Sequence, residues 1–101
     1  MINKNSKIFV AGHKGLVGSA IVKKLKYKGY KKILTIEKSK LDLTNQLKVY
    51  NYLKKNKPKF IFIAAAKVGG ILSNRDNKAE FISQNLLIQT NLIHGAYLAG
   101  V

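Results

Sequence analysis

Three glycines near the start of the chain, spaced three residues apart, could bind the phosphates of a nucleotide. Gly12, Gly15 and Gly18 follow a short apolar run at residues 8–11 and lead into a helix-like pattern. The first glycine permits a sharp turn, the second leaves room for a phosphate against the backbone, and the third lets the helix pack close to the strands. Amide N–H groups at the start of the helix would face the anion, with the positive end of the helix dipole behind them. The spacing therefore predicts a site for the pyrophosphate of a dinucleotide. A glycine-rich turn without a ligand is the alternative.

Charged residues after the second predicted strand bear on the choice between NAD and NADP. A carboxylate at this position binds the ribose 2′-OH of NAD, whereas a basic residue favours the 2′-phosphate of NADP. Glu37 and Lys38 give both signals, and Lys14 adds a positive charge within the glycine turn. We expect NADP (NADPH) as the coenzyme, with NAD less favoured. The alternative for both lysines is a solvated, lysine-rich surface.

Two further segments complete the predicted cofactor site. Asp42 and Leu43 could hold an adenine, one through its polar group and the other by apolar contact; a helix-preceding Asp beside a core Leu is the alternative. The small residues Ala64, Ala65 and Ala66 end an apolar run and would let a coenzyme lie close to the backbone. Tight packing between a helix and the sheet would explain the three alanines equally well.

Alternating strand-like and helix-like segments position these residues. Strands are expected at residues 7–11, 32–36 and 60–65, and helices at residues 15–28, 44–57 and 79–99, with Thr44 capping the second helix and a loop at 66–78. The order βαβαβα predicts an α/β, Rossmann-type three-layer fold with a parallel sheet, in which ligands bind beyond the carboxyl ends of the strands.

Three strands make only half of a doubly wound sheet. We expect the first strand to keep one neighbour and lose the other. Residues 1–101 would then be the N-terminal part of an NAD(P)-binding Rossmann domain, with the catalytic and substrate-binding parts absent. The expected buried residues of the last helix are Phe81, Ile82, Leu86, Ile93 and Ala96.

Composition narrows the class of protein. The 101 residues suffice for one small domain, and 47% of them are hydrophobic. The chain has no cysteine, which excludes disulfides and thiolate metal sites, and we predict no metal site. No apolar run has the roughly 18–20 residues of a membrane span. We therefore expect a cytoplasmic protein with no membrane partner.

The net charge of +15 raises the question of nucleic-acid binding. Only Arg75 among the 19 basic residues is an arginine, and the lysines are spread over the whole chain. No basic stripe is interleaved with aromatic residues. We expect no specific nucleic-acid partner, and a non-enzymatic basic nucleic-acid-binding module is the alternative from a different class.

Four segments of the chain resemble the GDP-L-fucose synthase family of extended short-chain dehydrogenases/reductases. They are GHKGLVGSAI at 12–21, LDLTN at 41–45, AAAKVGGI at 64–71 and NLLIQTNLIHGAYLAGV at 85–101, all in register. The glycine motif is shared by the whole superfamily, whereas the G-H-x-G opening and the A-A-A-K-V-G-G-I segment are more specific.

The resemblance implies an enzyme that epimerises GDP-4-keto-6-deoxy-D-mannose at C3 and C5 and then reduces the 4-keto group with NADPH. It implies a GDP-sugar substrate and a homodimer for the full-length enzyme. It assigns the pyrophosphate to Gly12, His13, Lys14, Gly15, Leu16, Val17 and Gly18. It assigns the 2′-phosphate to Lys14 and Lys38, where the family usually has arginine. The adenine falls to Asp42 and Leu43, and the ribose to Ala64, Ala65 and Ala66.

No catalytic residue is predicted within this chain. The family's serine and its Y-x-x-x-K motif would lie beyond Val101. Tyr50 and Lys54 do have that spacing, but they precede the third predicted strand instead of following a later one. Two alternatives stay open: another NAD(P)-dependent nucleotide-sugar epimerase or dehydratase, which Glu37 supports, and a truncated product that does not fold stably.

Overall fold

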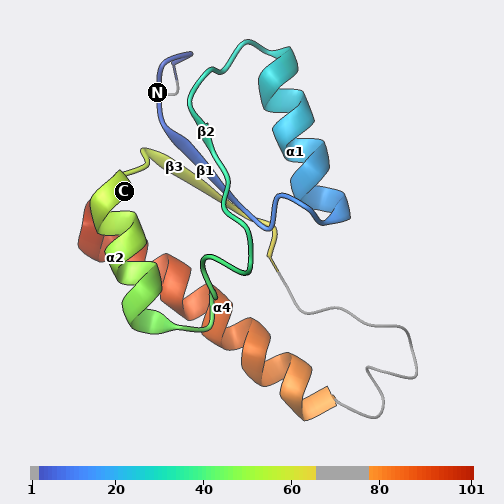
Figure 1. The fold of residues 1–101 in the computed structure, drawn as a ribbon, viewed down its shortest axis with the longest axis vertical. Coiled ribbons are helices and arrows are strands. Elements are labelled where there is room, and N and C mark those ends of the chain that lie inside the picture. The colour runs from blue at the N-terminus through green and yellow to red at the C-terminus, as the bar shows by residue number, and fades with distance from the viewer. Residues whose placement is uncertain (1–2, 66–77) are drawn as a thin grey trace.

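The computed structural model describes residues 3–65 and 78–101, which form three layers (Figure 1). The strands β1 (Ile8–Ala11), β2 (Ile33–Leu34) and β3 (Phe60–Ile63) make one parallel sheet. Helix α1 (Leu16–Tyr27) covers one face, and α2 (Gln46–Asn56) and α4 (Lys78–Ala99) cover the other. The predicted α/β class and the parallel sheet are confirmed.

The sheet order is β2-β1-β3, so β1 is the central strand and has a neighbour on both sides. The expectation that the first strand would lose one neighbour is wrong. After β2 the chain crosses over through α2 and returns on the far side of β1, where β3 pairs along its whole length. The crossover from β1 through α1 and the crossover from β2 through α2 therefore run in opposite directions across the sheet.

Strand β2 is shorter than the predicted 32–36. Only Ile33 and Leu34 pair with β1, because the chain then turns away from the sheet. The carbonyl of Glu37 accepts hydrogen bonds from the N–H groups of Lys40 and Leu41, which closes a turn at this point. Strand β3 likewise ends at Ile63, two residues before the predicted limit.

The core is organised around β1, whose side chains alternate between the two helical layers. Ile8 and Val10 pack on the side of α1, against Leu25. Phe9 and Ala11 pack on the side of α2 and α4, together with Leu41, Val49, Leu53, Ile88 and Leu92. Burial on both faces explains why β1 is a continuous apolar run.

Helix α4 buries a different face from the predicted one. Ile82, Leu86 and Ile93 are 50%, 58% and 60% exposed, whereas Ile88 and Leu92 are buried. The helix is apolar on nearly every side, so periodicity alone could not select the buried face. Gly95 selects it, because a Cβ there would lie 2.9 Å from the ring of Tyr50 on α2.

The other candidates of this helix are Ala96, which is half-buried, and Phe81, whose side chain lies outside the described part of the chain. The N-cap of α2 also differs from expectation. The side chain of Asn45 accepts a hydrogen bond from the N–H of Lys48 at 3.1 Å, so Asn45 and not Thr44 caps the helix.

We predict that the contact between α2 and α4 carries much of the stability. Leu53 is fully buried there, so Leu53→Ala should lower the free energy of unfolding by about 2–5 kcal/mol. Leu47 is 68% exposed on the same helix, and Leu47→Ala should change that free energy by less than about 0.5 kcal/mol. Urea unfolding followed by circular dichroism measures both values, and equal losses would contradict the packing described.

A candidate nucleotide-binding cleft

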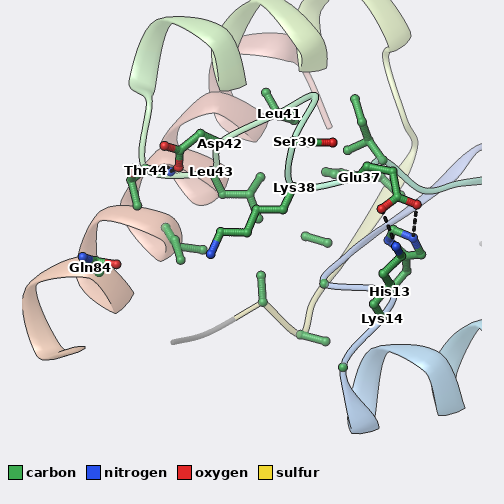
Figure 2. A pocket seen from close by; sticks show the side chains of 18 of the residues that line it. His13, Lys14, Glu37, Lys38, Ser39, Leu41, Asp42, Leu43, Thr44 and Gln84 are labelled. Atoms are coloured by element: carbon green, nitrogen blue, oxygen red, sulfur yellow. Dashed lines mark hydrogen bonds and ion pairs between the residues drawn. The ribbon is translucent and has the colours of Figure 1, made fainter. Parts of the chain in front are cut away.

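A cleft of about 740 Å³ opens at the carboxyl ends of β1 and β3. The glycine turn after β1, the loop after β2, the end of β3 and one side of α4 line it (Figure 2). It lies at the edge of the sheet where the direction of the crossovers reverses, with β2 on one side of β1 and β3 on the other, which is where open α/β sheets bind their ligands.

The backbone of the glycine turn is packed too tightly for side chains at two of its three glycines. Gly12 has φ +87°, and a Cβ there would lie 2.6 Å from the backbone N of Ala65. A Cβ on Gly18 would lie 1.8 Å from the carbonyl oxygen of Gly12. Gly18 therefore brings α1 against the turn itself, and not against the strands as predicted.

Gly15 is different, because the fold does not require a glycine at this position. It has φ −73° and ψ 170°, which any residue adopts. The nearest atom to a Cβ there would be the Gly12 carbonyl oxygen at 3.6 Å, an ordinary contact. The open side of Gly15 faces the cleft, where a ligand could approach the backbone.

The first turn of α1 has three backbone donors without a partner among the described residues, directly after Gly15, which lines the cleft. The N–H of Gly15 bonds to Gly12 and that of Ser19 bonds to Gly15. Among the residues that the structure describes, none accepts a hydrogen bond from the N–H of Leu16, Val17 or Gly18. The first turn also contains no acidic side chain. Unpaired donors at the positive end of a helix dipole suit an anion such as a diphosphate.

An ion pair connects the glycine turn to the loop after β2. Lys14 Nζ lies 2.6 Å from Glu37 Oε2, and His13 Nε2 lies 3.8 Å from the other carboxylate oxygen (Figure 2). The hydrogen bond from Lys14 lowers the pKa of the Glu37 carboxyl below its usual value, and the nearby positive charges of Lys14, His13 and Lys40 add to this. Glu37 is therefore ionised at neutral pH.

The loop that follows Glu37 is held by its own hydrogen bonds. The carboxylate of Asp42 accepts bonds from Thr44, from the N–H at 3.0 Å and from Oγ1 at 2.7 Å, and the hydroxyl bond is the main reason why the pKa of Asp42 is lowered. From α4, the buried side chain of Asn91 donates to the carbonyl of Leu43 at 2.9 Å. Both contacts fix the segment predicted to meet an adenine.

Most predicted site residues line the cleft: Gly12, His13, Lys14, Gly15, Lys38, Asp42, Leu43, Ala64 and Ala65. The side chains of Leu16 and Val17 point to solvent, with exposures of 90% and 63%, so only their backbone can serve the site. Gly18 is buried beneath the turn. Ala66 lies outside the described residues.

Other residues that line the cleft were not predicted from the sequence. Ser39 follows Lys38 directly and could have been included on that ground. Gln84, Leu87 and Ile88 come from α4, which no local signal connects to the glycine turn. Within residues 3–65 and 78–101 there is no group of three side chains that could hold a metal ion, and no helix long and apolar enough to cross a membrane.

Comparison with known proteins identifies the family to which the chain is similar. Residues 8–101 match the model of the NAD dependent epimerase/dehydratase family. The chain is 52% identical over its full length to putative GDP-L-fucose synthase 2 of Arabidopsis thaliana and covers 31% of that protein.

Two solved structures are similar over the whole chain. DdhaC has a TM-score of 0.97 at 50% identity, with 29% of it covered. MlghC, a GDP-mannoheptose C4 reductase from Campylobacter jejuni with NADP bound, has a TM-score of 0.95 at 39% identity, with 32% covered. The chain thus spans about 30% of the length of the relatives it matches.

We predict that Gly18→Ala destabilises the protein although alanine favours helices. In an exposed helix interior the change would stabilise by about 1 kcal/mol. Here the methyl group meets the Gly12 carbonyl, so the free energy of unfolding should fall by more than about 2 kcal/mol. Gly15→Ala, which meets no such contact, is the matched control. Urea titration compares them, and a Gly18→Ala variant as stable as the parent would contradict the geometry.

The pair between Lys14 and Glu37 should persist into mildly acidic solution. Because the folded-state pKa of Glu37 is lowered, its contribution to stability is fully present above the unfolded-state pKa and disappears as the pH falls through the folded-state pKa. NMR titration of the Glu37 carboxyl should give a midpoint below that of an unstructured glutamate, and Lys14→Met should raise it. A midpoint at the ordinary value in the parent would refute the pair.

Proposed function

The chain belongs to the NAD dependent epimerase/dehydratase family, and we propose that it is the NADP(H)-binding portion of an enzyme that acts on a GDP-linked sugar. The first candidate is GDP-L-fucose synthase, the name carried by the Arabidopsis relative with 52% identity. NADP is favoured because MlghC, which resembles the chain over its whole length, was solved with NADP bound.

The proposal covers the domain organisation. Residues 1–101 would be the N-terminal part of an NAD(P)-binding Rossmann domain, and the catalytic and substrate-binding parts would belong to the remaining length seen in relatives. The described residues bind and orient the coenzyme and carry out no catalytic step. Epimerisation at C3 and C5, reduction of the 4-keto group, the GDP-sugar site, the homodimer and a cytoplasmic location all belong to the proposal for the full-length enzyme.

One observation carries the coenzyme assignment: the three unpaired N–H groups at the start of α1 beside the open face of Gly15. Donors held by the helix need no rearrangement to meet a diphosphate, and the missing side chain lets the phosphates come close. The coenzyme, when bound, supplies the hydride for reduction of a keto group. The protein's part in this portion of the fold is to hold the two nucleotides in place.

The remaining contacts follow from the cleft walls. Lys38 and Lys14 lie on the side of the cleft where a 2′-phosphate would bind, Asp42 and Leu43 meet the adenine, and the backbone at 64–65 lies along a ribose. Lysine keeps the charge that an arginine would bring but lacks its bidentate fork, so the 2′-phosphate is held by charge more than by geometry.

A second candidate is a reductase of GDP-linked heptoses, because MlghC shares 39% identity and the same fold over the whole chain. Both candidates use the same coenzyme and nucleotide and differ in the sugar. Assaying the complete gene product with GDP-4-keto-6-deoxy-D-mannose and with a GDP-4-keto-heptose would distinguish them. Nucleic-acid binding that weakens steeply with rising salt concentration, together with no binding of coenzyme, would instead support the nucleic-acid-binding module.

Gly15→Ala tests the coenzyme assignment without disturbing the fold. A methyl group on the open face of Gly15 should keep phosphates from the backbone and weaken NADPH binding by about tenfold, which is about 1.4 kcal/mol. The melting temperature without ligand should stay the same. The fluorescence of NADPH on titration with the chain measures its affinity.

Val17→Ala is the matched control, because Val17 contributes only its backbone and its side chain points to solvent. It should bind NADPH as the parent does. Equal affinities of all three proteins for NADPH, or no binding by the parent, would reject the pyrophosphate site.

A further inference from the structure

Glu37 follows β2, where the ribose 2′-OH or 2′-phosphate of a dinucleotide is expected, and its two carboxylate oxygens face Lys14 and His13. Lys14 Nζ is 2.6 Å from Oε2, and His13 Nε2 is 3.8 Å from Oε1. Lys14 and Glu37 come from different loops, so the pair closes one wall of the cleft (Figure 2). The charge of Lys14 is already neutralised before any ligand arrives.

Lys38 is next to Glu37 in sequence, yet its side chain takes another direction. Figure 2 shows it pointing away from the carboxylate and into the cleft. Within the described part of the chain no carboxylate lies within ion-pair distance of its amine. The cleft therefore presents one neutralised lysine and one available lysine on the side where a 2′-phosphate would lie.

We infer that Glu37 sets the coenzyme selectivity of the cleft by withholding Lys14 from a 2′-phosphate and leaving Lys38 to recognise it. This inference rests on the proposed function, since it concerns how the same site distinguishes two dinucleotides. A 2′-phosphate must compete with the Glu37 carboxylate for Lys14, and the negative charge of that carboxylate repels the phosphate. A 2′-OH can donate a hydrogen bond to the same carboxylate. Glu37 thus narrows the preference for NADP over NAD.

Solvent access limits the size of the effect. The side chains of Lys14 and Glu37 are 71% and 43% exposed, so water and salt screen their charges. Removing the carboxylate should therefore change the selectivity by roughly fivefold to tenfold, in the range expected for one charge a few ångströms from a phosphate in a wet site.

Glu37→Gln tests the inference, because glutamine keeps the size of the side chain and the backbone carbonyl bonds to Lys40 and Leu41. The ratio of NADP affinity to NAD affinity, measured by calorimetry on the chain, should rise by about fivefold to tenfold. A purely structural role would change both affinities alike. The matched control is Asn51→Lys, which raises the net charge by the same one unit but at an exposed position of α2 away from the cleft, and it should leave the ratio unchanged.

A second pair of variants isolates the mechanism. Lys14→Met should cost little NADP affinity in the parent and several-fold more in the Glu37→Gln background, where the lysine is released. Lys38→Met should cost the same NADP affinity in both backgrounds. This non-additivity is the signature of two groups that interact directly.

The outcomes separate the two proposals. If the parent binds NADP but Glu37→Gln leaves the affinity ratio unchanged or lowers it, or if Lys14→Met costs the same in both backgrounds, the role of Glu37 is wrong and the coenzyme site stands. If the parent binds neither dinucleotide at millimolar concentration, both proposals are overturned.

Discussion

The contact between the Gly18 Cα and the Gly12 carbonyl is the constraint on which the cleft depends. With no Cβ in the way, the first turn of α1 sits directly on the turn that leaves β1, and its unpaired N–H groups come directly after Gly15, which lines the cleft. Gly12 makes the matching approach on the other side, against the backbone of Ala65 at the end of β3. Two glycines thus join a helix and two strands at one point, and the third, Gly15, is left free for a ligand.

Local sequence signals predicted the elements around this point and failed where the fold depends on distant contacts. The apolar run of β1 and the glycine turn are consecutive in the chain, so they could be predicted as a strand, a turn and a helix. The position of β3 beside β1 could not, because strand order depends on which way the crossover through α2 runs. The buried face of α4 was also missed, since Gly95 selects it by admitting Tyr50.

The same division applies to the candidate site. Its glycine turn and the loop after β2 each stand out as short motifs, and most of the residues chosen from them line the cleft. The wall formed by α4 comes from a helix some forty residues further on than Leu43, and the buried bond from Asn91 to that loop has no sequence signature. The sequence identified Glu37 and Lys14 as charged residues near the coenzyme, but only the structure shows that they form an ion pair. That pair changes how each residue is expected to affect the preference between NADP and NAD.

An NMR titration tests the central claim most directly. With uniform ¹⁵N labelling, adding NADPH should shift the amide signals of Leu16, Val17 and Gly18 more than those of any other helical residues, because these amides are unpaired at the helix start. Inorganic pyrophosphate should shift the same signals at higher concentration. If NADPH binds while these three amide signals stay in place, the helix start is not the diphosphate site and the account fails.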